Sequence, residues 1–93
     1  MKVIFRKFND GQVIAIFPQL PGTNNIYQDC DSYMHKGQHG ACGLQIAIVT
    51  KPATPEEYTP LLNELKSIGY DDLKPAKRIT HADFLSRKAA LNA

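Results

Sequence analysis

Residues 30–43 read CDSYMHKGQHGACG, and the rest of the chain is organised around this stretch. It contains both cysteines, two of the three histidines and three of the six glycines. A strand-like run over residues 26–35 leads directly into a glycine-punctuated loop, and loops held on a rigid scaffold often carry binding groups. The stretch therefore marks the predicted site, although it completes no motif with a known mechanism.

Alternation within the predicted strand 26–35 separates its side chains into two faces. The more apolar face, which we expect to lie toward the core, carries Cys30, Ser32 and Met34. The other face, which we expect to be exposed or to face a ligand, carries Asp29, Asp31, Tyr33 and His35. After the loop, the apolar and β-branched residues 44–49 predict a further strand.

The chain before the site predicts a β-hairpin. Residues 1–8 alternate in polarity, residues 13–17 are apolar, and Asp10-Gly11 lies between the two runs. This dipeptide is typical of tight hairpin turns, because the turn requires positive φ angles.

The chain after the site predicts the main helix. Thr54 is a capping residue, Pro55 occupies the first helical position, and the Glu57 side chain can bond back to the backbone of Thr54. An apolar stripe follows, formed by Tyr58, Leu61, Leu62, Leu65 and Ile68. Gly69 suits the left-handed residue that ends a helix. Pro60 removes one helical hydrogen bond, so we expect a kink there or a separate first turn.

The C-terminal part predicts an edge strand and a second helix. Residues 73–79 form the strand, which Pro75 confines to an edge. Thr80 and Asp83 predict the start of a helix over residues 81–91, anchored by Phe84, Leu85 and Leu91 or docked on a second subunit. The fold class is thus α+β in a single domain over residues 1–93. A small antiparallel sheet of four to five strands packs on one main helix (1–79), followed by the C-terminal helix (80–93).

Composition limits the partners. The chain has 93 residues, 43% of them hydrophobic, and a net charge of +2, which is typical of one globular domain and does not favour nucleic acid. Its basic end, with five Lys or Arg from Lys74 onward against one acid, predicts a solvated face. No apolar run reaches the roughly 20 residues that span a bilayer, and charge interrupts the N-terminus too early for a signal peptide. We therefore expect a cytoplasmic protein with free thiols and no membrane partner.

Two kinds of reactive site are compatible with the residue types. Cys30, His35, His39 and Cys42 are competent zinc ligands, but their spacing matches no usual motif and alternation separates Cys30 from His35. The same residues supply a cysteine–histidine pair, with Asp31 to orient the histidine, for nucleophilic catalysis.

A binding site without catalytic residues, metal or cofactor is the favoured hypothesis. Tyr33 would stack on a ligand, Gln38 and the histidines would hydrogen-bond, and Arg6 or Lys51 would contact phosphate. The complete predicted set is Arg6, Ser32, Tyr33, His35, Gly37, Gln38, His39, Gly40 and Lys51.

Four segments carry a resemblance: MKVIFRKFNDGQVIAIFPQLPGT (1–23), SYMHKGQHG (32–40), KPATPEEY (51–58) and ELKSIGYDDL (64–73). Over about residues 1–73 the chain resembles a group of short, uncharacterised proteins of bacteriophages and other mobile elements. SYMHKGQHG is the most distinctive segment, and the pattern has no fixed cysteine at Cys42. The resemblance implies a phage-like accessory protein acting in the host bacterial cytoplasm, and it brings no catalytic role.

These observations predict a phage-like, non-catalytic protein that sequesters a small host ligand, with a nucleotide-type defence signal as the specific hypothesis. A homo-oligomer assembled through the C-terminal helix would give such a small chain room for a site. Two alternatives remain open. One is a protein-interaction module that inhibits a host enzyme directly, through the face of Phe84 and Leu85; the other is a small zinc- or Cys/His-dependent hydrolase.

Overall fold

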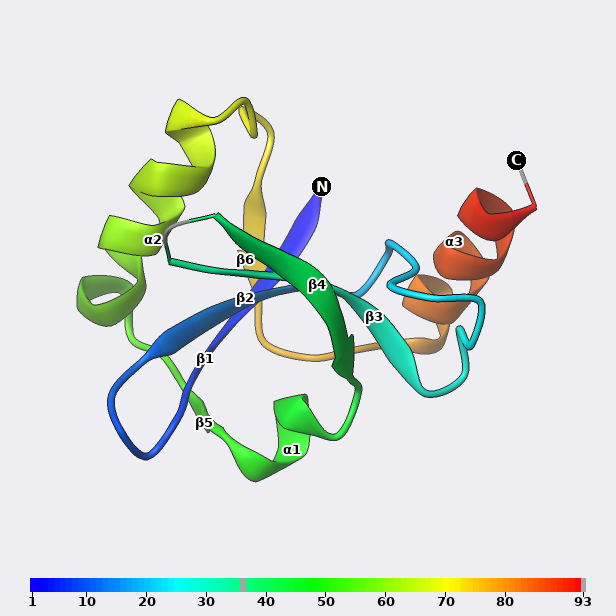
Figure 1. The fold of residues 1–93 in the computed structure, drawn as a ribbon, viewed down its shortest axis with the longest axis horizontal. Helices are drawn as coiled ribbons and strands as arrows, with labels where there is room; N and C mark the ends of the chain where they lie inside the picture. The colour runs from blue at the N-terminus through cyan, green and yellow to red at the C-terminus, as the bar shows by residue number, and fades with distance from the viewer. Residues whose placement is uncertain (36, 93) are drawn as a thin grey trace.

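The computed structural model describes residues 1–35 and 37–92. The elements in chain order are β1 (Lys2–Lys7), β2 (Val13–Phe17), β3 (Asp29–Met34), β4 (Gln38–Gly43), α1 (Ile46–Val49), β5 (Lys51–Pro52), α2 (Pro55–Ser67), β6 (Lys74–Ala76) and α3 (His81–Leu91). In the view of Figure 1 the sheet lies in the middle, with α2 on the left and α3 on the right. The predicted α+β class is confirmed.

Within the described residues the sheet has six strands, in the order β4-β3-β2-β1-β5 with β6 also paired to β1. The outer edge of β1 is shared: β6 pairs in parallel with its first half, and β5 pairs antiparallel with its end. The predicted hairpin joins β1 and β2. Gly11 has a φ of 89°, and its N–H donates to the Phe8 carbonyl at 3.0 Å.

Both faces of the sheet are covered. The face under α2 buries a cluster of Val3, Phe5, Ala15, Phe17, Tyr33, Leu61 and Leu65. The opposite face buries Ile4, Ile14, Ile16 and Cys30, against which α1 and Ile79 pack. This two-sided burial explains why β1 and β2 contain consecutive buried residues instead of a simple alternation.

Helix α2 begins and ends as its sequence predicts. Glu57 N–H donates to Thr54 Oγ1 at 3.3 Å, and Thr54 N–H donates to Glu57 Oε1 at 2.9 Å. Gly69 has a φ of 118°, and Tyr70 N–H donates back to the Leu65 carbonyl. The expected separate first turn at Pro60 is wrong, because α2 is continuous from Pro55 to Ser67.

The predicted strand over residues 44–49 is wrong. The preceding residues, Gln38–Gly43, form the strand β4 instead, and Ile46–Val49 form the short helix α1. The sheet order gives the reason, because β4 and β5 lie at opposite ends of the main path. The chain between them must cross a face of the sheet, so it cannot also be one of its strands.

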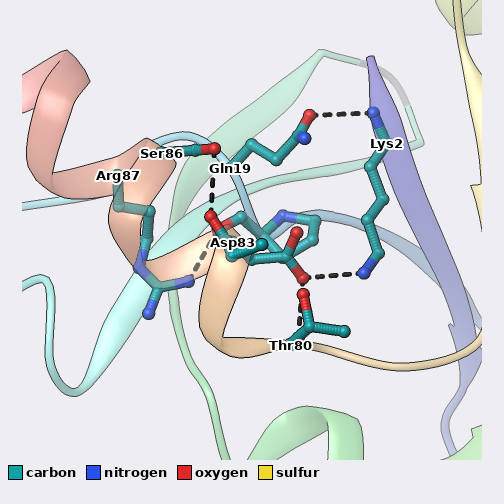
Figure 2. Close-up of polar contacts among 8 residues, drawn as sticks. Lys2, Gln19, Thr80, Asp83, Ser86 and Arg87 are labelled. Carbon is teal, nitrogen blue, oxygen red and sulfur yellow. Dashed lines mark hydrogen bonds and ion pairs between the residues drawn. The ribbon is translucent and has the colours of Figure 1, made fainter.

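Helix α3 docks mainly through buried charged groups, which Figure 2 shows together. Asp83 and Arg87 are only 3% and 2% exposed. Asp83 Oδ2 accepts from Lys2 Nζ at 2.7 Å and from Thr80 N–H at 2.8 Å. Arg87 donates to the carbonyls of Pro18, at 2.6 Å, and Ile26, at 3.1 Å. Arg87 therefore does not belong to the solvated basic face that the sequence predicted.

The apolar anchors expected for α3 contribute less. Phe84 is half-buried against Tyr27, with ring centroids 5.1 Å apart. Leu85 and Leu91 are 51% and 38% exposed. The expectation that these leucines anchor the helix within its own chain is wrong, because buried hydrogen bonds do so.

Candidate functional site

Most of the predicted site residues lie on a β-hairpin formed by β3 and β4, not in an irregular loop. Ser32 is opposite Gly40, Tyr33 opposite His39, and Met34 opposite Gln38. Gly37, in the connection, has a φ of 80°, a conformation that favours glycine. Alternate residues of a strand point to opposite faces, so the hairpin divides the predicted site into two groups.

One group lies on the face covered by α2 and is joined to Glu64. The Glu64 carboxylate accepts a hydrogen bond from Tyr33 Oη and pairs with His35 Nδ1. Gly37 N–H donates to Tyr33 Oη at 3.0 Å. The hydrogen bond to Glu64, followed by burial, raises the pKa of Tyr33. This cluster fastens the hairpin to α2.

Tyr33 does not lie on an exposed face. It is 2% exposed and belongs to the core cluster beneath α2, so the expectation that this face of β3 is open at Tyr33 is wrong. The physical reason is that α2 covers the face that the sequence left open. As placed here, the ring has no free face on which a ligand could stack.

The two histidines of the hairpin are exposed at its α2 side. The His39 ring meets Tyr33 edge-on at 4.6 Å and lies 6.3 Å from the ring of Tyr70. The side chain of His35 is 71% exposed beside Glu64. A carboxylate that orients a histidine is typical of general-base pairs.

The second group lies on the opposite face and lines a concave surface of about 370 Å³. We call this the hairpin hollow. It is lined by Phe8, Ile14, Ser32, Met34, Gln38, His39, Gly40, Ala41, Cys42, Gly43 and Ile46. Ser32 Oγ donates to the Gly40 carbonyl at 2.8 Å, which ties the two strands together across it. Of the predicted site residues, Ser32, Gln38, His39 and Gly40 thus border one hollow.

The two predicted phosphate-binding cations lie elsewhere. Arg6 is 9% exposed, and its guanidinium donates to the Thr50 side chain and carbonyl. Lys51 is exposed on β5, opposite Lys7, so β1 and β2 separate it from the hairpin. Neither cation lines the hairpin hollow.

The described residues do not have the geometry that either reactive alternative, a zinc site or cysteine–histidine catalysis, requires. Cys30 and Cys42 face the hollow side, with Sγ atoms 4.0 Å apart, whereas the rings of His35 and His39 contact residues of the α2 side. The residues that the structure describes contain no group of three or more His, Cys, Asp or Glu side chains placed to hold a metal ion. Neither a zinc set nor a cysteine–histidine pair is therefore assembled among them.

Glu64 is the residue that sequence reasoning missed. It lies between Leu61 and Leu65, the two buried positions of the α2 stripe. That position is a usable signal, because a charged residue beside a buried stripe can reach a polar partner on the facing sheet. The identity of the partner is a tertiary fact that the sequence pattern does not contain.

In the part of the chain that the structure describes, no helix has the length and apolar character needed to cross a membrane. Comparison with family models, with curated proteins and with solved structures finds no match for this chain.

Proposed function

We propose that this chain is a non-catalytic binding protein that captures a small polar ligand in the hairpin hollow. The recognised part would be a planar, uncharged group, such as the base of a nucleotide-type host signal. This is the behaviour expected of a phage-like accessory protein that sequesters such a signal. The observation that carries the proposal is the open space above Gly40.

Gly40 has no evident structural need to be glycine. Its φ lies outside the positive range, and a Cβ built on it would meet no atom within 4 Å. A glycine in the interior of a strand weakens the strand and often marks a close approach by a ligand or another backbone. A ligand that lies in the hairpin hollow close to the β4 backbone would explain why residue 40 is glycine.

The lining of the hollow favours an uncharged planar group. Phe8, Ile14, Met34 and Ile46 supply apolar area, and the ring of Phe8 could take the stacking role that was predicted for Tyr33. The exposed amide of Gln38 can donate and accept hydrogen bonds. None of the described residues that line the hollow is a lysine or arginine, so phosphate groups would project into solvent.

A graded series at Gly40 tests the proposal. A thermal-shift and calorimetric screen would compare nucleosides with the corresponding mono-, di- and cyclic nucleotides. A bound ligand raises the melting temperature by mass action, and nucleoside and nucleotide should bind with similar affinity. Gly40→Ala, Gly40→Val and Gly40→Leu should fold normally and weaken binding progressively.

A Lys51→Ala variant is the control for the position of the site. Two strands, β1 and β2, lie between Lys51 and the hairpin, so this change should leave affinity unaltered. Absence of any thermal shift, or affinity that depends on Lys51 and ignores Gly40, would overturn the proposal.

A second candidate function, inhibition of a host protein by direct contact, is favoured by the surface of α1. Ile48 and Val49 are 81% and 70% exposed. They adjoin a hollow lined by Leu44, Ala47, Ile48, Lys77, Arg78 and Ile79. An exposed aliphatic pair beside two cations suits a partner segment with apolar and acidic side chains. Replacing Ile48 and Val49 by serine should abolish inhibition in this case and leave nucleoside binding intact.

A further inference from the structure

The two cysteines form a directly opposed pair on neighbouring strands. Cys30 of β3 pairs with Cys42 of β4, both thiols are free, and their Sγ atoms are 4.0 Å apart. Directly opposed residues of antiparallel strands have Cα atoms roughly 4.5–5.5 Å apart, within the roughly 4.4–6.8 Å that a disulfide requires. Bond formation would need side-chain rotation with little movement of the backbone.

The two thiols differ in access and in acidity. Cys30 is fully buried, whereas Cys42 is half-buried and lines the hairpin hollow. The hydrogen bond between the Cys30 and Cys42 sulfurs lowers the pKa of Cys42 against the opposing effect of burial. The same contact, together with burial, raises the pKa of Cys30. Thiolate character and access together decide which cysteine reacts first, and both favour Cys42.

We propose that Cys30 and Cys42 form a reversible dithiol–disulfide pair that exchanges with low-molecular-weight disulfides entering the hairpin hollow. The Cys42 thiolate attacks one sulfur of the small disulfide, and the other sulfur leaves as a thiolate. The Cys30 sulfur then attacks the Cys42 sulfur of the mixed disulfide, and its proton passes to the departing small thiolate, which leaves as the second small thiol. The protein loses two protons and two electrons, and the small disulfide is reduced to two thiols.

The arrangement assigns separate roles to the two residues. Cys42 is the attacking cysteine because an incoming disulfide can reach it. Cys30 resolves the mixed disulfide because its sulfur already lies beside that of Cys42. The new bond would join β3 to β4 next to the Ser32–Gly40 contact and make the hairpin more rigid. The pair requires no ligand in the hollow, so it does not rest on the proposed function.

Oxidation of the folded full-length chain by glutathione disulfide tests the proposal. The wild-type protein should lose two hydrogens by mass, remain free of intermolecular disulfides and gain thermal stability that dithiothreitol reverses. The Cys30→Ser variant should stop at the mixed disulfide on Cys42. The Cys42→Ser variant should react at least about tenfold more slowly, because its buried thiol reacts only after local opening.

A measurement on the unaltered protein protects the test against variants that fold poorly. Limiting iodoacetamide followed by peptide mapping should modify Cys42 before Cys30. Equal rates for the two thiols would overturn the assignment. Accumulation of two mixed disulfides on one chain, or a folded protein that resists glutathione disulfide, would overturn the proposed pair.

Discussion

Replacing Asp83 by alanine is the sharpest test of how α3 is held on the sheet. The change removes the acceptor of Thr80 N–H, worth about 1 kcal/mol at a helix start. It also removes a charge-assisted hydrogen bond from Lys2, worth roughly 1.5–3 kcal/mol. The Lys2 side chain is 18% exposed and can turn toward water after the change. The expected loss of stability therefore lies in the lower part of the range obtained by adding these two contributions. We expect a loss of about 3 kcal/mol in the free energy of unfolding.

Urea denaturation, with thermal unfolding beside it, measures this loss. For a domain of this size, about 3 kcal/mol corresponds to a fall in melting temperature of roughly 12–24 °C. Asp71→Ala is the matched control, because Asp71 is an exposed acid, and it should change the free energy by no more than about 0.5 kcal/mol. Asp83→Asn combined with Lys2→Met isolates the ionic coupling. A loss below about 1 kcal/mol for Asp83→Ala, with an unchanged m-value, would refute the reasoning.

Four further changes test other parts of the structure. The hydrogen bond from Lys7, followed by that from the Thr54 backbone, lowers the pKa of Glu57 from 4.5 to about 2. The stability that Glu57 contributes is therefore fully present above about pH 4.5 and lost as the pH falls toward 2, so Glu57→Gln should flatten acid denaturation over that window. His39→Ala removes an edge-on contact with Tyr33 and should cost about 0.5–1.5 kcal/mol of stability in urea. Leu65→Ala, at a fully buried position, should cost about 2–5 kcal/mol in the same assay. If α3 assembles a homo-oligomer, Leu85→Ser should shift the mass measured by light scattering toward the monomer, and an unchanged mass would exclude Leu85 from the interface.

The parts of the fold that the sequence predicted are those with local causes. The turn at Asp10-Gly11 needs positive φ, and the α2 cap lies within four consecutive residues, Thr54 to Glu57, so each signal is complete in a short segment. The sequence predicted a loop over residues 38–43 and a strand that includes residues 46–49, whereas the structure has a strand and a helix there. The cause of this difference is non-local. Residues 38–43 are rich in glycine and have a weak preference for strands, but their pairing with β3 makes them a strand. Residues Ile46–Val49 are mostly β-branched, but they form a helix because the chain must cross a face of the sheet to reach β5.

Buried charge explains the error at α3. Asp and Arg are rarely buried unless they are paired. Arg87 was expected on a solvated basic face, and Asp83 was expected only to take part in starting the helix. Their partners are Lys2, which is 81 positions from Asp83, and the carbonyls of Pro18 and Ile26. No periodicity in residues 80–91 could reveal partners so far away in the chain. The helix was predictable from its cap, whereas its means of docking was not.

The sequence predicted a candidate site on this segment and expected the Tyr33 face of β3 to be open, whereas α2 covers that face. The alternation of side chains along β3 places Ser32 and Tyr33 on opposite faces of the sheet, but it does not say how far each face is covered. Both faces carry a buried cluster. Helix α2 covers the face of the sheet on which Tyr33 lies. Its residue Glu64 contacts Tyr33 and His35 near the turn of the hairpin. On the other side the cover extends only as far as Ile46, which leaves the backbone of β4 open at Gly40. The same open surface borders Cys42, so ligand capture and thiol exchange would share one entrance and compete if both occur.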